Sequence, residues 1–144
     1  MKENIYLKLK NKQQEEIDNF PFGFAFNDQQ FKEMMHKWGI TENDTDKIFS
    51  LGHGSYICKA DAQAMEDMFA RHKKELWEEI NKDTDGTGFI YDMFVYELAD
   101  KEYCYTLDEQ ETLDYLGITT EDIQNNTNLK KGLRKAINHC KGLI

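Results

Sequence analysis

Residues 61–82 read DAQAMEDMFARHKKELWEEINK, the longest helical pattern in the chain. Apolar side chains recur in it at the i, i+3, i+4 spacing with which one helix face meets a core. Asp61 stands where an N-cap is expected. The stretch therefore predicts a long amphipathic helix, with a buried stripe made of Met65, Met68, Phe69, His72, Leu76 and Ile80.

The chain before this helix predicts two shorter helices. The opening residues alternate like a strand at first, but their polar run favours a helix to about Asn19, which Pro21 stops because proline disfavours helix in the residue before it. Asn27 and Gln30 occupy the two positions of a capping box and open a second helix. Gly39 is placed to end that helix in the left-handed conformation.

The chain after residue 82 predicts four more helices. The run Phe89–Asp100 is apolar and aromatic, which indicates a helix buried on most sides. Each later helix has a polar capping residue before it. The expected caps are Thr106 with Glu109 for a helix to Leu116, Thr119 or Thr120 for a short helix, and Asn128 for the last one.

Only one strand signal stands out. Residues 47–51 and 55–59 are short apolar runs around Gly52-His53-Gly54, which is typical of a β-hairpin. At 144 residues, the chain is long enough for one core. We therefore expect a mainly α fold (α+β with a small β-hairpin), forming a single compact helical domain over residues 1–144.

One local pattern occurs twice. Residues 38–44, WGITEND, resemble residues 116–122, LGITTED. Both read as a helix end, a glycine C-cap, a buried isoleucine and a threonine N-cap. Acidic neighbours make a DNA-reading helix-turn-helix a poor interpretation of the second copy, because phosphate would be repelled.

The net charge of −9 is concentrated in one segment. Residues 92–122 hold ten acids and one base, Lys101, whereas residues 123–144 hold five bases and no acid. This balance argues against binding nucleic acid or anionic lipid directly. Solvated faces explain such runs in most proteins. The alternative is an acidic surface for a basic partner, formed by Asp92, Glu97, Asp100, Glu102, Asp108, Glu109, Glu111, Asp114, Glu121 and Asp122 with Tyr103 and Tyr105.

A calcium site is the sharpest local alternative. Counting Asp83 as position 1 of an EF-hand loop, Asp85 falls at position 3 and Gly88 at position 6. Position 12 is Phe94, where a bidentate glutamate should close the coordination shell. Asp83 and Asp85 are therefore only weak candidates for calcium ligands. A glycine-rich turn between two helices would have the same sequence without binding an ion. We expect no cofactor.

Nothing in the sequence assembles a catalytic group. His53 in the hairpin turn stands five residues before Cys58, but no third residue is spaced to orient the pair. His72 reads as a core histidine. The three cysteines form no CxxC and, with no secretory signal, indicate reduced thiols in a cytoplasm. We therefore expect a protein that is not an enzyme and does not bind a membrane. The alternative is an unrecognised small enzyme that uses His53 or His72.

Several blocks together resemble a known family. They are residues 19–26 (NFPFGFAF), 47–61, 71–76 (RHKKEL), 85–106 and 112–123. The chain resembles a family of small acidic proteins of unknown function, found in bacteria and often on phage and other mobile elements. The resemblance covers about residues 13–137. It implies that the chain is similar in kind to anti-CRISPR inhibitors and that a relative of the chain is one that blocks Cas9. It implies a protein-binding inhibitor of a nucleic-acid-processing defence enzyme in the host cytoplasm, or an accessory domain of a mobile element, and assigns no residue a role.

Overall fold

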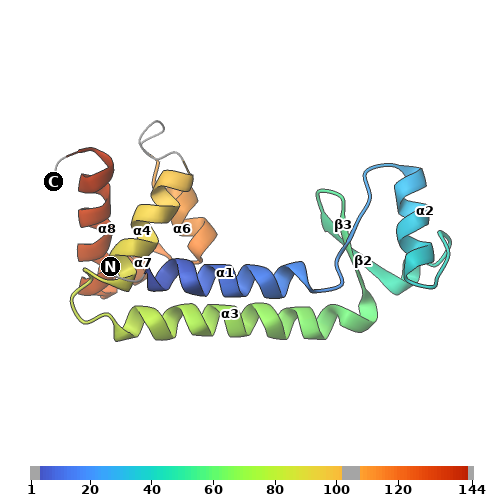
Figure 1. The fold of residues 1–144 in the computed structure, drawn as a ribbon, viewed down its shortest axis with the longest axis horizontal. Coiled ribbons are helices and arrows are strands. Elements are labelled where there is room, and N and C mark those ends of the chain that lie inside the picture. The colour runs from blue at the N-terminus through green and yellow to red at the C-terminus, as the bar shows by residue number, and fades with distance from the viewer. Residues whose placement is uncertain (1–3, 102–107, 143–144) are drawn as a thin grey trace. The chain divides into compact units, whose positions relative to one another are not determined.

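The computed structural model describes residues 4–101 and 108–142. It confirms a mainly helical fold with a small antiparallel sheet (Figure 1). The elements are α1 (Ile5–Asp18), β1 (Gly23–Phe24), α2 (Asp28–Lys37), a 3₁₀ turn (Thr45–Lys47), β2 (Ile48–Gly52), β3 (Ser55–Cys58), a second 3₁₀ turn (Lys59–Asp61), α3 (Ala62–Lys82), α4 (Phe89–Asp100), α6 (Gln110–Leu116), α7 (Thr120–Asn125) and α8 (Thr127–Cys140).

Contacts divide the chain into two compact units, and the division falls inside α1 and α3. Unit 1 comprises Met1–Gln13 and Lys74–Ile144, and unit 2 comprises Gln14–Lys73. Each has its own buried cluster. One domain over residues 1–144 stays a prediction.

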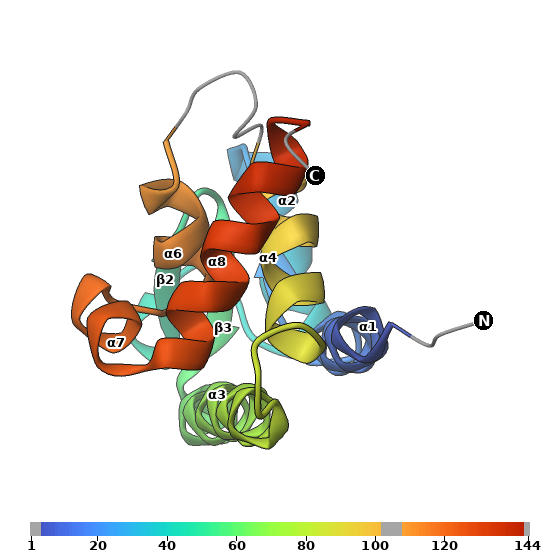
Figure 2. The same ribbon diagram turned by 90° about the vertical axis from the view of Figure 1, so that its left-hand side faces the viewer.

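Unit 1 is built around α4, the helix that was predicted to be buried on most sides. Ile90, Met93, Phe94 and Leu98 are fully buried in it. Helix α4 packs against α8 and α6, and α7 packs against α8 (Figure 2). Gly132 brings α8 close to α4, because a Cβ there would stand only 2.5 Å from Ile90 Cγ2.

Unit 2 combines α2 with a three-stranded sheet of order β1-β3-β2. Both strand pairs are antiparallel, with Phe49 opposite Ile57 and Gly23 opposite Tyr56. The hairpin of β2 and β3 was predicted, whereas β1 was not, because residues 20–26 read as an aromatic connector. A buried cluster contains Ala25, Met34, Met35 and Ile48.

Helix caps follow the sequence in two cases and depart from it in one. Asn27 Oδ1 accepts from Gln30 N at 2.8 Å, and Thr119 forms a full capping box with Asp122. The last helix begins two residues earlier than expected, because Asn126 rather than Asn128 caps it. Asn128 lies inside α8 and donates instead to the carbonyl of Asp83 at 3.1 Å.

The repeated glycine corner is present at both predicted positions. Gly39 and Gly117 have φ of 77° and 69°, the left-handed region that glycine tolerates best. The isoleucine after each glycine donates its amide to the carbonyl five residues back, Ile40 to Met35 and Ile118 to Leu113, each at 3.0 Å. This is the Schellman arrangement that ends a helix.

The long helix departs from its predicted stripe at one residue. Met68, His72 and Ile80 are buried as expected, but Phe69 keeps 42% of its surface exposed. The centre of the Phe69 ring lies 6.4 Å from that of Phe22. It lies 6.1 Å from the ring centre of His72, which it meets edge-on. Periodicity places a residue on a face, but the width of the covered stripe depends on what packs against it.

Candidate functional site

The acids predicted to form one surface have unequal exposure. Five are exposed: Asp100, Asp108, Glu111, Asp114 and Glu121. Three are half-buried: Asp92, Glu109 and Asp122. Glu102, Tyr103 and Tyr105 lie outside the described residues, as does the expected cap Thr106. Among the described residues, the exposed members of the candidate acidic surface are therefore Asp100, Asp108, Glu111, Asp114 and Glu121.

Glu97 was predicted to belong to the acidic surface, and this is wrong because its side chain is fully buried. It lies on the inner side of α4, where Tyr6 OH donates a hydrogen bond to its Oε2. A buried carboxylate needs charged or hydrogen-bonding partners to offset the loss of water. Glu97 finds charged partners in Lys10 of α1 and in Lys101, the residue that follows α4.

Two lysines neutralise the Glu97 carboxylate. Lys10 Nζ donates to Oε2 at 2.8 Å, and Lys101 Nζ lies 3.4 Å from Oε1. Lys101 also pairs with exposed Asp100 at 2.8 Å. The two lysines and two carboxylates cancel, so this group adds no net charge to its surroundings. Sequence reasoning missed Lys10, because nothing local links it to a residue so far along the chain.

The same two lysines fix the position of Tyr115. Lys10 Nζ donates to the Tyr115 hydroxyl at 2.7 Å and lies 4.6 Å from the ring centre. Lys101 Nζ lies 3.9 Å from that ring centre. Yet the residue keeps 54% of its surface exposed. Tyr115 is thus an exposed aromatic side chain whose position is fixed by contacts with Lys10 and Lys101.

The protonation behaviour of the group agrees with this geometry. Burial and the hydrogen bond to Glu97 both raise the pKa of Tyr6. For Lys10, burial works to lower the pKa, but bonds to Glu97 and Tyr115 outweigh it and the pKa is raised. The Lys101 ammonium lowers the pKa of Asp100. Burial likewise works to lower the pKa of Lys101, but its bonds to Asp100 and Glu97 outweigh burial and the pKa is raised, so both lysines keep their positive charge near neutral pH.

Helix α6 presents an acidic face around Tyr115. Glu111, Asp114 and Tyr115 follow the i, i+3, i+4 spacing and are all exposed. Glu121 is exposed in the first turn of α7. We call these four residues the α6–α7 surface. Residues 108–125 contain six acids and no base, so nothing within the segment neutralises it.

A shallow hollow adjoins this surface. It has a volume of about 390 Å³ and lies where α6 turns into α7. Its lining includes Leu113, Asp114, Ile118 and Thr119. Polar residues, among them Gln110 and Thr120, line it together with the apolar Leu113 and Ile118. An apolar wall beside the Asp114 carboxylate suits the stem and head of a long basic side chain.

Among the described residues, no further acidic, histidine or cysteine side chain joins Asp83 and Asp85 to complete a calcium site. The Asp83 carboxylate accepts from Gly86 N, Gly88 N and Ile90 N at 2.9–3.2 Å, so it organises the loop and the start of α4. Asp85 accepts from the amide and hydroxyl of Thr87. Phe94, at the closing position, is fully buried.

The histidines and cysteines form no nucleophilic pair in the part of the chain described. His53 is exposed in the hairpin turn, while burial, followed by the charge of Asp61, raises the pKa of Cys58 and disfavours its thiolate. His72 is buried beside Glu16, 3.6 Å away. Cys140 is disulfide-bonded, so the expectation of three reduced thiols is wrong for that residue. Cysteine spacing alone does not reveal pairing.

Among the described residues, no helix is long and apolar enough to cross a bilayer. The chain belongs to a family of unknown function, DUF7659, whose model matches residues 5–139. Neither the curated proteins nor the solved structures contain a match.

Proposed function

We propose that the chain is a non-enzymatic protein-binding module that inhibits a basic, nucleic-acid-processing partner by covering its positively charged surface. The observation that carries the proposal is Tyr115, exposed and fixed within the acidic α6–α7 surface. Aromatic side chains dominate the energy of many protein interfaces, and a rigid one loses little entropy on binding. Surrounding acids would speed the encounter with a positive partner.

The resemblance to proteins of phage and mobile elements makes a Cas9-type defence enzyme of the bacterial cytoplasm the first partner to test. Such an enzyme holds nucleic acid in a positively charged channel and reads its short adjacent motif with arginines. The exposed acids Glu111, Asp114 and Glu121 carry the complementary charge. Occupying that channel or motif-reading site requires no catalysis and no cofactor.

A binding and cleavage assay with matched charge variants tests the proposal. The surface variant is Glu111→Gln, Asp114→Asn and Glu121→Gln. The control variant is Glu15→Gln, Asp46→Asn and Glu66→Gln, which neutralises three exposed acids elsewhere. Both variants have the same net charge. Purified chain is added to guide-loaded Cas9, and complex formation and DNA cleavage are measured.

We expect the unmodified chain to form a complex and suppress cleavage. The surface variant should lose about tenfold or more in affinity, and the control about twofold or less. Equal loss in both variants would show that bulk charge, not this surface, drives binding. No complex and undiminished cleavage at excess chain would reject Cas9 as the partner.

Substitution of Tyr115 tests the anchor independently of charge. Tyr115→Ala should weaken binding by about tenfold or more, whereas Tyr115→Phe, which keeps the ring, should lose less. Affinity is measured at matched fold content, checked by circular dichroism. Equal affinity of the alanine variant and the unmodified chain would remove Tyr115 from the interface.

A further inference from the structure

Unit 2 contains an aromatic pocket that plays no part in the proposed function. It has a volume of about 500 Å³ and lies between the end of β1, the start of α2 and the β2–β3 turn. Three rings line it, those of Phe26, Phe31 and Tyr56. Its volume is within the range typical of ligand sites.

The aromatic walls are set before any ligand arrives. Phe31 and Tyr56 meet edge-on, with ring centres 5.4 Å apart. The Phe26 ring lies against Gly54, where a Cβ would stand only 2.4 Å from Phe26 Cε1. Gln30 Oε1 accepts from Phe26 N at 2.8 Å, so the backbone is fixed although the residue is 73% exposed.

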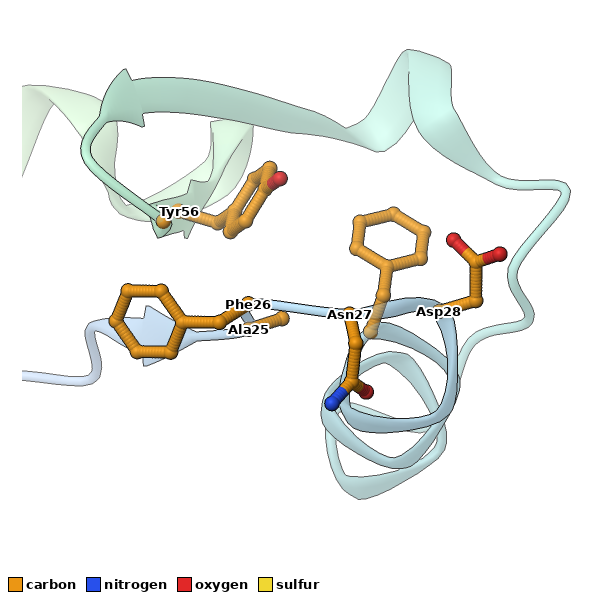
Figure 3. A pocket seen from close by; sticks show the side chains of 7 residues that line it. Ala25, Phe26, Asn27, Asp28 and Tyr56 are labelled. Atoms are coloured by element: carbon orange, nitrogen blue, oxygen red, sulfur yellow. The ribbon is translucent and has the colours of Figure 1, made fainter.

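One carboxylate stands in the pocket wall. Asp28 is exposed there, while the neighbouring Asn27 Oδ1 is already bonded to Gln30 N. Figure 3 shows Tyr56 across from the Ala25–Asp28 segment, with the Phe26 ring and the Asp28 carboxylate toward opposite ends of it. A ligand lying along the segment would meet an aromatic surface at one end and a negative charge at the other.

The charge of the surroundings selects a cation. The start of α2 contributes roughly half a positive charge, which the full negative charge of Asp28 exceeds. Unit 2 as a whole holds eleven acids and six bases. An anion would therefore be repelled by the Asp28 carboxylate.

We infer that this pocket binds an arginine side chain of a protein partner. A guanidinium stacks on aromatic faces and pairs with a carboxylate through two parallel hydrogen bonds. A lysine ammonium offers neither the planar stack nor the paired bonds. The inference concerns unit 2 alone and holds whether or not the α6–α7 surface binds a nucleic-acid enzyme.

Titration of the full chain with a blocked Gly-Arg-Gly peptide, followed by amide NMR shifts, tests the inference. We expect saturable shifts at Phe26, Asp28 and Gly54, and an affinity about threefold or more above that of the Gly-Lys-Gly peptide. Asp28→Asn and Tyr56→Leu should each lower the affinity for the arginine peptide by about threefold or more. Asp46→Asn, an equal charge change outside the pocket, should not.

Three outcomes would overturn the inference. One is the absence of saturable shifts at the pocket. Another is equal affinity for the arginine and lysine peptides. The third is equal weakening by Asp28→Asn and Asp46→Asn, which would show attraction to net charge alone. Because no defence enzyme enters this experiment, its failure is distinct from failure of the proposed function.

Discussion

Glu97 shows how one buried carboxylate organises a surface it does not belong to. Its charge holds Lys10 and Lys101, and these hold Tyr115. Glu97→Gln keeps the shape of the side chain but removes the charge that both ammonium groups face. We expect unfolding free energy to fall by about 1–3 kcal/mol, measured by urea denaturation. Asp100→Asn, which removes the exposed partner of Lys101, should change stability little.

A second carboxylate, that of Glu16, makes the stability of the fold depend on pH. Glu16 bonds Arg71 through two guanidinium nitrogens, which lowers its pKa from 4.5 to about 2. A depressed native pKa gives stability that is complete above pH 4.5 and is lost as the pH falls toward about 2. The stability advantage of the unmodified chain over Glu16→Gln should therefore shrink between about pH 6 and about pH 3. Urea midpoints at both values measure it, and a constant advantage would contradict the assignment.

At the scale of elements, the contact between α4 and α8 depends on Gly132. Alanine in a helix gains about 1 kcal/mol over glycine. Here its Cβ would also stand 2.8 Å from the Gly86 carbonyl oxygen, a backbone atom that cannot turn aside. Overpacking costs about 1–3 kcal/mol, so the clash should exceed the helix gain. Gly132→Ala should lower the thermal midpoint, whereas Arg134→Ala on the exposed side should leave it nearly unchanged.

The sequence predicts elements best where the defining bonds are local. The Asn27 cap and the Gly39 and Gly117 corners each close within a few residues, so the local sequence is enough to predict them. For α7 the sequence left Thr119 and Thr120 as alternative caps, and the structure has Thr119. Strand β1 was missed because it has two residues and its partners on β3 lie about thirty positions away. The start of α8 was misplaced because Asn126 and Asn128 are equally good caps by residue type.

In the candidate site, too, the features that depend on local sequence were predicted, and those that depend on distant contacts were not. The exposed acids of α6 and α7 were identified, since charge and exposure usually coincide. The burial of Glu97 and the roles of Lys10 and Tyr115 were not. These depend on α1 meeting α4, a contact between residues far apart in the chain, for which periodicity and spacing carry no signal.

For the whole molecule, charge predicts the kinetics of association. If the α6–α7 surface steers a basic partner, raising salt from about 0.05 M to about 0.5 M should slow association much more than it changes dissociation. Rates measured by surface-based interferometry would show a flatter salt dependence for the surface variant than for the control variant. An association rate independent of salt would exclude steering by this surface.

The division of the chain has a consequence for the order of synthesis. Residues Gln14–Lys73 of unit 2 are inserted in sequence between the two parts of unit 1. The ribosome delivers Tyr6 and Lys10 first, but the Glu97 carboxylate that they bind comes only after all of unit 2 has been made. Unit 2 can thus close its sheet and α2 while the first two turns of α1 still wait for their partner. The bonds from Tyr6 and Lys10 to Glu97 thus join segments of unit 1 that are made before and after unit 2.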